Sequence, residues 1–515
     1  MSETTPGAAA PRPQPHGIDT KIDARGKPSL KRGAIGLISA LLLGIASVAP
    51  AYSFAAILGP LVGEAGVQAP AVVIVSFIPM LFVATAYYWM NRADPDCGTT
   101  FSWATKALGP TTGWMAGWAI LAAGVIVIGL LANTAAFYTF DLVGWEAARD
   151  SKWAVIGVAV VMMVAATYIT VRGIEASARV SNVLMVIQIG GLLLFAFVAL
   201  ARVLFGDGGP TSVDPAASWF SPFAIDSSSA LIAGVLLGIF AYWGWDSAVA
   251  VNEETEDPTE SPGRAAVIST VLLLGLYLLI TVGALAWLGT EELAAFEDEA
   301  ALSTIASQIM AEPLAKLVVL AVLVSALAST QTTVLPSSRT LLSMGRNGAA
   351  PGPLAYIHPR FQTPTVATYV VGGLAIVFYV VLAGLADSFY QDALLVLGLL
   401  ICVNYGINAL ACFVYYRSEL FHSAKTFLTM GLLPFVGFLI FGYVFVRSIY
   451  DFSLSGEDAN YALGLQVPLV IFTGLLVLGI LLIVALRMSA EKRVTFFGRK
   501  LETAEHRIVP ASDLA

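Results

Sequence analysis

Charged residues are scarce in this 515-residue chain: lysine, arginine, aspartate and glutamate together make up only 12% of it. Soluble globular domains carry about a quarter charged residues. The chain is also 57% hydrophobic, with a mean hydropathy of +0.80. This balance excludes an ordinary soluble protein and predicts a polytopic membrane protein.

Cysteine and histidine are also rare, and their positions narrow the possible functions. Cys97, Cys402 and Cys412 have no CxxC spacing, which argues against a disulfide framework and a metal site. The four histidines all lie outside the apolar segments, which argues against a membrane-buried metal centre or a histidine proton relay. Because no GxxxxGK[ST] motif is present, we expect no ATPase module in this chain. We also expect no ATP-binding partner subunit and no cofactor.

Long apolar runs, in contrast, are abundant. A helix of about 20 apolar residues crosses the hydrocarbon core of a bilayer. The sequence therefore predicts an all-α polytopic membrane protein with twelve transmembrane helices. The candidate spans are 33–63, 70–91, 111–143, 153–171, 180–205, 228–252, 264–289, 313–340, 364–384, 390–416, 426–448 and 465–487.

Lysine and arginine are distributed unevenly between the two sides of these spans. With the N-terminus in the cytoplasm, 22 of the 27 fall on the inner side and 5 on the outer side, as the positive-inside rule requires. Both termini are therefore predicted to be cytoplasmic, in a cell (inner) membrane. The polar segments 1–32 and 488–515 are predicted to be disordered tails. Their basic residues suit topology and anionic lipids better than a nucleic-acid partner.

Two spans that lie five helices apart contain interruptions. Pro50 lies midway along the first span among small residues, and proline removes a backbone donor. The sixth span has a weak point at "YWGWDS", where Gly244 stands between two tryptophans. A simple kink in each helix is the alternative. Interrupted helices at corresponding places of two halves are typical of inverted-repeat transporters.

This symmetry predicts the organisation of the chain. Residues 33–205 form the first five-helix repeat and 206–416 the second, with an extracellular loop at 206–227. Two further helices occupy 417–487. In such a design the helix N-termini at the breaks present N–H groups to an anionic substrate group, and the freed carbonyls receive a cationic one. An amino acid carries both charges on one carbon, so it suits such a site.

Four segments resemble the amino acid–polyamine–organocation (APC) permease family. "FAYWGWDSAVAVNEETEDP" resembles the sixth helix of that family, and "DPDCGTTFSWATKALGPTTGWMAGW" the loop between its second and third helices. "GIEASARVSNVLMVIQI" is similar to the start of its fifth helix, and "SSRTLLSMGRNGAAP" to the end of its eighth. The resemblance extends over all twelve spans. It implies a LeuT-like five-plus-five fold, a transporter and not an enzyme, and substrate contacts from helices one and six.

The chain departs from the family pattern at two places. Ser47-Val48-Ala49-Pro50 stands where many relatives have G-[SA]-G, so the contacts to a substrate carboxylate differ. Gln188 stands where some proton-coupled relatives have a lysine in the fifth helix. Because glutamine cannot titrate, proton coupling through that position is unavailable. The coupling ion, H+ or Na+, remains open at this point.

Asp246 is the leading candidate for a functional residue. A carboxylate placed mid-span costs about 2.5–3.5 kcal/mol on insertion scales, and no lysine or arginine appears mid-span to pair with it. A structural acid is the alternative. The neighbouring aromatic residues stack on a substrate cation or serve as packing. The predicted substrate-binding residues are Ser47, Val48, Ala49, Pro50, Tyr52, Phe240, Tyr242, Trp243 and Asp246, and the predicted coupling-ion residues are Ser329, Thr330 and Gln188.

The acidic run after the sixth span is expected to be a solvated helix end, with a gating contact to an inner-loop arginine as the alternative. It contains Glu253, Glu254, Glu256 and Asp257. We predict a secondary active transporter of amino acids that works by alternating access, with a polyamine or other organic amine as the alternative substrate. A membrane enzyme fits less well because the spans contain no paired carboxylates and no nucleophile–base pair. A channel fits less well because broken helices favour an occluded site.

Overall fold

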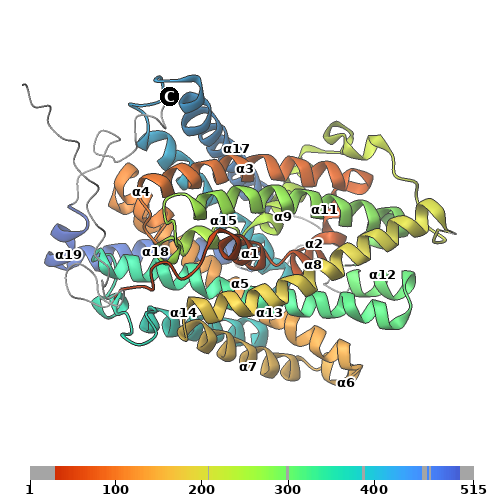
Figure 1. The fold of residues 1–515 in the computed structure, drawn as a ribbon. Coiled ribbons are helices and arrows are strands. Elements are labelled where there is room, and N and C mark those ends of the chain that lie inside the picture. Colours follow the sequence, from red (N-terminus) through yellow and green to blue (C-terminus); the bar gives the residue numbers. More distant parts are fainter. Residues whose placement is uncertain are drawn as a thin grey trace, which may run out of the picture.

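The computed structural model describes residues 29–206, 208–296, 301–385, 389–454, 461–462 and 465–498. Most of the two predicted tails lies outside these residues, so the disorder of that part stays a prediction. The prediction is wrong for the start of the C-terminal tail, where Ala490–Thr495 form a helix and Phe496 is fully buried. In the described part of the chain, nearly all secondary structure is helical, and the long helices run side by side in one bundle (Figure 1). This arrangement satisfies backbone hydrogen bonds within each segment, as the bilayer interior demands.

The helices of the first half follow the predicted spans closely. Their bounds are α1 Leu37–Val48, α2 Pro50–Ala65, η1 Gly66–Gln68, α3 Ala69–Ala93, α4 Thr100–Leu108, α5 Pro110–Val143, α6 Glu146–Arg149, α7 Lys152–Val171 and α8 Ile174–Phe205. The fifth span begins six residues earlier than the predicted start at 180. The short helices α4 and α6 lie between spans, and the sequence pattern did not predict them.

The second half begins with two short 3-10 turns and then repeats the pattern of long helices. Its bounds are η2 Ala217–Phe220, η3 Pro222–Ala224, α9 Ser228–Tyr242, α10 Ser247–Ala250, η4 Asn252–Glu254, α11 Ser261–Ala294, α12 Ala301–Ile309, α13 Glu312–Arg346, η5 Gly352–Ala355, α14 Thr365–Leu385 and α15 Phe389–Tyr415. The last part comprises α16 Ala424–Thr426, a π-helical turn η6 Phe427–Leu432, α17 Leu433–Ser453, β1 Tyr461–Ala462, β2 Leu465–Gln466, α18 Val467–Met488 and α19 Ala490–Thr495. The two strands pair antiparallel.

Eleven stretches of the described residues are long and apolar enough to cross a membrane. The first of them, Leu37–Ala93, is 57 residues long and contains α1, α2, η1 and α3. At 1.5 Å per residue it is far longer than the roughly 30 Å of a bilayer core. The chain is therefore a multi-pass membrane protein, and the prediction of a polytopic all-α protein is confirmed.

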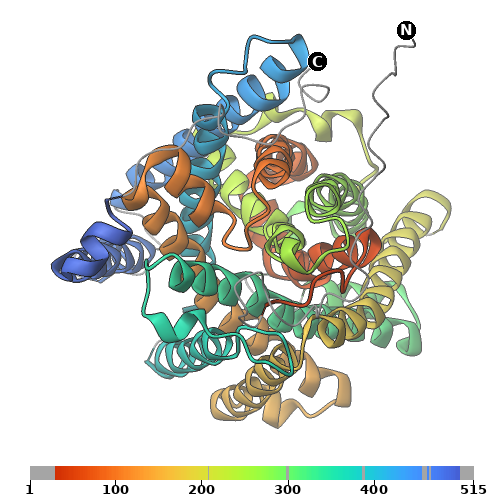
Figure 2. The same ribbon diagram turned by 60° about the vertical axis from the view of Figure 1, so that its left-hand side comes forward.

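The predicted interruption of the first span is a true break. α1 ends at Val48, and Ala49 takes a left-handed conformation with φ 52° and ψ 61°. Such a conformation is uncommon for a residue with a Cβ atom. Pro50 then opens α2, a position where its missing N–H would have no helical partner in any case. The two short helices lie near the middle of the bundle, beside the green helices α9 and α11 (Figure 2).

The sixth span is broken as well. α9 ends at Tyr242, Trp243 is extended with φ −72° and ψ 142°, and Gly244 has a φ of 125°. The helix resumes for one turn as α10. A φ of this sign is strained for any residue with a side chain, so glycine is needed at this turn.

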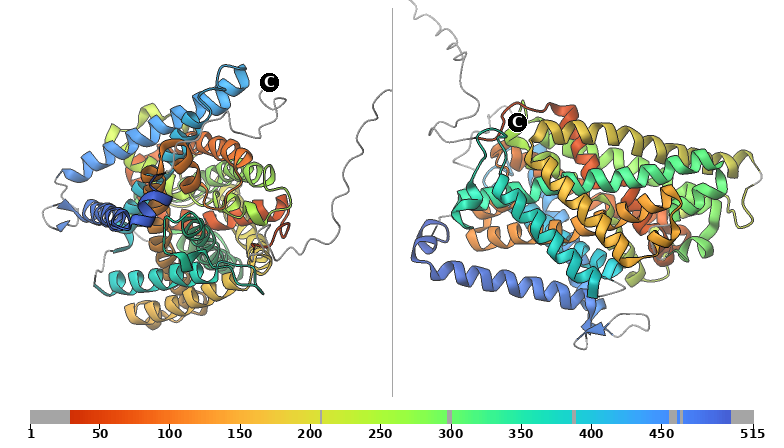
Figure 3. Two further views of the ribbon diagram at one scale, coloured as in Figure 1. Left: turned by 90° about the vertical axis from the view of Figure 1, so that its left-hand side faces the viewer. Right: turned by 90° about the horizontal axis from the view of Figure 1, so that it is seen from below.

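The helices of the C-terminal part lie at the edge of the bundle. α18 runs along one side of it, and only 17% of its most apolar window is buried, against 78% for α5 (Figure 3). Exposed apolar side chains are expected on a lipid-facing helix because lipid, not water, surrounds them. The core therefore sits around α1, α2, α9, α10 and the helices packed on them.

Candidate functional site

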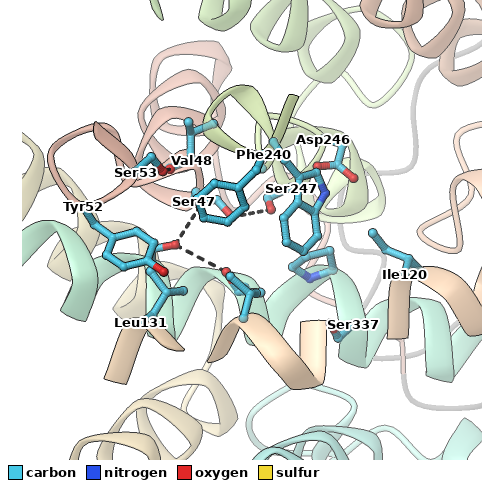
Figure 4. A pocket seen from close by; sticks show the side chains of 16 residues that line it. Ser47, Val48, Tyr52, Ser53, Ile120, Leu131, Phe240, Asp246, Ser247 and Ser337 are labelled. Atoms are coloured by element: carbon cyan, nitrogen blue, oxygen red, sulfur yellow. Dashed lines mark hydrogen bonds between the residues drawn. The ribbon is translucent and has the colours of Figure 1, made fainter. Parts of the chain in front are cut away.

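A small cavity lies where the two broken helices meet. Figure 4 shows side chains of α2, α9, α10, α5 and α13 turned toward it. Its lining residues are Ser47, Val48, Tyr52, Ser53, Ile120, Val127, Leu131, Phe240, Trp243, Gly244, Asp246, Ser247, Ser329, Thr333, Pro336 and Ser337. Its volume of about 20 Å³ is room for about one water molecule. A larger ligand requires the surrounding side chains to move.

The two breaks touch each other through their backbones. A Cβ atom added to Gly244 would lie 2.7 Å from both the carbonyl carbon and oxygen of Ser47 and 2.8 Å from Val48 N. Such distances are too short for any side chain, so only glycine permits this approach. The close contact joins the unwound part of the sixth span directly to the end of α1.

Three hydrogen bonds from serine hydroxyls hold the break in the first span. Ser329 Oγ, on α13, donates to the carbonyl oxygen of Ser47 at 2.7 Å. Ser53 Oγ donates to the carbonyl oxygen of Val48 at 2.7 Å, and the hydroxyls of Ser47 and Ser247 lie 2.6 Å apart. Carbonyls freed by a break need partners when they are buried. Ser329 and Ser53 supply them from α13 and α2, and the contact between Ser47 and Ser247 ties α1 to α10.

The N-terminus of α2 has few backbone donors left for an anion. Pro50 has no N–H, Ser53 N donates to Ala49 O at 2.8 Å, and Tyr52 N donates to Ser325 Oγ at 3.3 Å. The N–H groups of Tyr52 and Ser53, in the first turn of α2, therefore already have partners. This arrangement is the structural consequence of having Ser47-Val48-Ala49-Pro50 in place of a glycine-rich break.

Asp246 is buried at the start of α10, with 5% of its surface exposed. Its backbone carbonyl accepts from Val249 N and Ala250 N, at 2.9 and 3.0 Å. Within the described chain, no basic side chain approaches its carboxylate within the 4.0 Å of an ion pair. The phenol groups of Tyr87 and Tyr405 are close enough to interact electrostatically with it. Asp246 is thus a buried carboxylate whose neighbours are polar and uncharged.

Aromatic side chains from both broken spans close over the cavity. The rings of Tyr52 and Phe240 meet edge to face with centroids 6.3 Å apart, and Trp243 completes this wall. Tyr242 points elsewhere: its ring packs on Tyr277 at 5.0 Å and its hydroxyl donates to Val73 O at 3.3 Å. The aromatic run is therefore divided between the cavity and the protein core.

The structure brings together most, but not all, of the predicted site residues. Ser47, Val48, Tyr52, Phe240, Trp243, Asp246 and Ser329 line the cavity. Ala49 and Pro50 form the break behind it without lining it. Thr330 is turned away and donates to Ala326 O at 2.7 Å. Gln188 is fully buried in α8, where its side-chain nitrogen lies 3.3 Å from Met185 Sδ and its oxygen has no partner.

Several lining residues were missed by the sequence reasoning. Ile120, Val127 and Leu131 come from α5, and Thr333 and Ser337 from α13. The three apolar residues have no local sequence signal, because apolar residues occur throughout a membrane span. The two hydroxyl residues follow Ser329 at intervals of four, and this helical spacing was the available signal.

Two ion pairs outside the cavity connect η4 to the C-terminal part of α13. Arg339 donates from Nε and Nη2 to the Glu254 carboxylate at 2.7 and 3.0 Å, and both side chains are fully buried. Arg346 Nη1 forms an ion pair with Glu253 Oε1 at 2.9 Å. Burial raises the pKa of the Glu254 carboxyl, while Arg339 opposes this effect. The expectation of a solvated helix end is therefore wrong for Glu254, whose arginine partner lies inside α13 and not in an inner loop. A gating role stays a prediction.

One cluster near these pairs has metal-ligand chemistry. Potential ligand atoms of Asp96, Cys97 and Glu253 lie within 4.8 Å of one another. However, Asp96 Oδ1 already accepts from Gly98 N and from the hydroxyls of Ser102 and Ser343, at 2.7 to 2.8 Å. These hydrogen bonds, together with the pairing of Glu253, identify the cluster as a clamp between α4, η4 and α13.

The sequence model of the family described as "Amino acid permease" matches residues 35–476. This range includes both breaks, the cavity and the ion pairs below it. The chain belongs to the amino acid permease family. Its members are transporters and not enzymes, and the resemblance to APC permeases is confirmed.

Relatives of this chain include transporters of different substrates. An uncharacterized transporter of Mycobacterium tuberculosis is 29% identical over 353 residues, which are 68% of this chain and 75% of the relative. The low-affinity putrescine importer of Escherichia coli is 24% identical over 443 residues, 84% of this chain and 91% of the importer. A branched-chain amino acid permease of Bacillus subtilis is 24% identical over 378 residues, 68% of this permease and 75% of the relative.

Proposed function

We propose that this permease is a secondary active transporter that moves amino acids across the cytoplasmic membrane by alternating access. The substrate binds at the unwound segments of the first and sixth spans. In this proposal α1 and α2 together make one crossing, as do α9 and α10, which gives twelve crossings in a LeuT-like arrangement of two five-helix repeats plus two helices. Both termini lie in the cytoplasm.

The direct contact between the two breaks is the observation that carries this proposal. Gly244 packs on Ser47 and Val48, so the breaks of two spans lie at one cavity. Binding sites built this way receive both ends of a zwitterion. In this proposal the buried pair of Glu254 with Arg339 is part of a gate on the predicted cytoplasmic side of the cavity, which alternating access requires.

A coupling ion has a candidate place beside the first break. The carbonyl of Ser47 and the hydroxyl of Ser329 supply oxygen atoms there, the ligand type that Na+ prefers. Thr330 and Gln188 complete the proposed set, although each now points to a neighbour in its own helix. If protons drive transport instead, Asp246 is the buried group that would carry them.

A polyamine or other organic amine is the second candidate substrate. The buried, unpaired carboxylate of Asp246 favours it, because an ammonium group would neutralise this charge. The few donors at the α2 N-terminus also suit a substrate without a carboxylate. The putrescine importer, which aligns with 84% of this chain, belongs to the same family.

Thermal unfolding of the purified permease with a panel of amino acids and diamines, each with and without sodium, tests the proposal. A ligand at a hundred times its Kd stabilises the folded state by about 2.7 kcal/mol. Stabilisation by amino acids supports the first candidate, and stabilisation by putrescine or related diamines alone supports the second. Uptake of the selected ligand into proteoliposomes must then require an ion gradient. Uptake that equilibrates without any gradient dependence contradicts secondary active transport.

A further inference from the structure

A second cavity lies at the predicted cytoplasmic ends of α7, α8 and α14, away from the substrate site. Its volume is about 330 Å³, at the lower end of the range for small-molecule sites, about 300–1,000 Å³. It is formed by the segment before α1, the turn between α7 and α8, and the loop before α14. Its lining residues are Lys31, Arg172, Gly173, Ile174, Glu175, Ala176, Arg179, Arg360, Phe361 and Gln362.

Positive charge dominates this basic cavity. Four cationic side chains and one carboxylate line it, for a formal charge of +3. The single acid, Glu175, is already paired with Lys31 at 2.6 Å. Within the described ranges, Arg172, Arg179 and Arg360 have no carboxylate within 4.0 Å. Three guanidinium groups therefore converge without a counter-charge, and a bound anion would supply it.

The cavity is held in shape by its own contacts. Arg172 donates to the Tyr168 hydroxyl and lies over the Phe361 ring, 5.3 Å from its centroid. Thr363 Oγ1 donates to Val171 O at 2.9 Å, which ties the loop before α14 to the end of α7. Gln362 is 5% exposed and has a φ of 54°, unusual for a residue with a side chain. These contacts hold the backbone that carries Arg172 and Arg360 in place.

The positive-inside rule alone does not explain this arrangement. That rule needs basic residues on inner loops, not their convergence from three separate segments around one cavity. Arg417, just beyond α15 on the same predicted side, is exposed and lies outside the cavity. The first turn of α8 also faces the cavity, and the positive end of a 32-residue helix favours anions.

The surface beside the cavity faces lipid. On α8, Val183 and Val186 follow Arg179 toward the membrane and are 60% and 74% exposed. On α7, Val161 and Val164 precede Arg172 and are exposed as well. An apolar face that leads directly to a basic cavity fits a molecule with acyl chains and an anionic head. A free phosphate would need only the cavity.

We propose that this basic cavity binds the phosphate-bearing headgroup of an anionic phospholipid from the leaflet on the predicted cytoplasmic side. Arg179 and Arg360 hold the phosphate oxygens, Arg172 is oriented by its aromatic neighbours, and the acyl chains lie along the valines of α8. The proposal concerns a site separate from substrate transport and does not rest on the transported molecule.

Lipid binding by the full-length protein tests the site directly. Purified protein in detergent is titrated with phosphatidylglycerol or phosphatidylcholine, and bound lipid is counted by native mass spectrometry. We expect selective binding of phosphatidylglycerol. Each of Arg179→Gln and Arg360→Gln should weaken it roughly fivefold, since one basic residue near the surface is worth about 1 kcal/mol. Glu175→Gln should strengthen it, because the only lining carboxylate is removed.

Arg417→Gln is the matched control and should leave phosphatidylglycerol binding unchanged. An equal loss in this control would show that general surface charge, and not the cavity, attracts the lipid, and would overturn the proposal. Glycerol phosphate, which has the phosphate group but no acyl chains, is tested as a soluble competitor of phosphatidylglycerol. If it competes at the same concentration as the lipid, the ligand is a free phosphate ester and the lipid assignment is wrong. Unchanged binding in both cavity arginine variants would also overturn it.

Discussion

At the scale of single residues, Asp246 decides which substrate groups the proposed site can bind. It is a buried carboxylate that lines the cavity, and among the described residues no lysine or arginine forms an ion pair with it. Burying an unpaired carboxylate costs free energy, and a cation bound beside it would offset that cost. Ser329 has a different role, because its hydroxyl fixes the freed carbonyl of Ser47.

Asp246→Asn keeps the shape of this side chain and removes its charge. Losing a charged hydrogen bond inside a protein costs about 1.5–3 kcal/mol, which is roughly 10- to 150-fold in affinity. We therefore expect uptake in proteoliposomes, normalised to protein amount, to fall at least tenfold. A diamine should lose more than a neutral amino acid. A well-folded variant that transports at the parent rate would show that the aspartate is structural.

Gln188→Leu tests the role of the fifth span in coupling. Gln188 is fully buried and its side-chain oxygen has no partner in the structure. Because an amide does not titrate, we expect any pH dependence of uptake to persist in this variant. Uptake rates across a pH series are the measurement. Loss of the proton response alone, with sodium dependence retained, would place Gln188 in a proton-linked network.

At the scale of elements, the sequence predicts both breaks but not how they meet. Pro50 and "YWGWDS" are local signals of backbone that cannot continue as a helix, so they are visible in the sequence. The packing of Gly244 on Ser47 joins residues about 200 positions apart, and no local pattern encodes it. For the same reason the burial of Glu254 was missed: its partner Arg339 lies 85 residues further along the chain.

Gly244→Ala should separate the two breaks. Its Cβ would lie 2.7 Å from backbone atoms of Ser47, and its φ of 125° is strained for alanine. Such strain costs about 1–3 kcal/mol before any clash is counted. We expect a lower unfolding temperature and at least a tenfold loss of uptake. Gly275→Ala is the control, since its Cβ would have no neighbour within 4 Å. Equal effects of the two changes would contradict the proposed contact.

The buried ion pair between Glu254 and Arg339 gives a second prediction at this scale. Removing one partner leaves an uncompensated buried charge, which costs about 3–5 kcal/mol. Arg339→Leu and Glu254→Leu should each lower the unfolding temperature strongly. The double variant should be more stable than either single one, which a double-mutant cycle of unfolding temperatures measures. Strictly additive losses would mean that the two side chains act independently.

At the scale of the whole molecule, the predicted spans match the observed helices to within a few residues at most ends. Apolar length and composition alone fix these segments, because a bilayer admits few other structures. The sidedness of the bundle rests on charge alone, so labelling tests it. Cysteines at Ser218, which is exposed in η2, and at Ala424 in α16 lie at opposite ends of the bundle by this topology.

In a background without Cys97, Cys402 and Cys412, an impermeant thiol reagent applied to intact cells should label Ser218→Cys and not Ala424→Cys. The positive-inside distribution of lysine and arginine is the reason for this expectation. Permeabilised cells should label both variants, which controls for accessibility. Labelling of Ala424→Cys alone in intact cells would invert the orientation of the molecule.

The buried pair of Arg339 with Glu254 also sets an order of events during synthesis. Glu254 leaves the ribosome 85 residues before Arg339, a delay of about 4–17 s at the usual rate of about 5–20 residues per second. Until the arginine is made, the ionised glutamate lacks its ion-pair partner, and its burial is costly. We therefore expect α10 to dock after the eighth span is made. A nascent chain that stops before residue 339 would have its first spans in the membrane but no finished cavity.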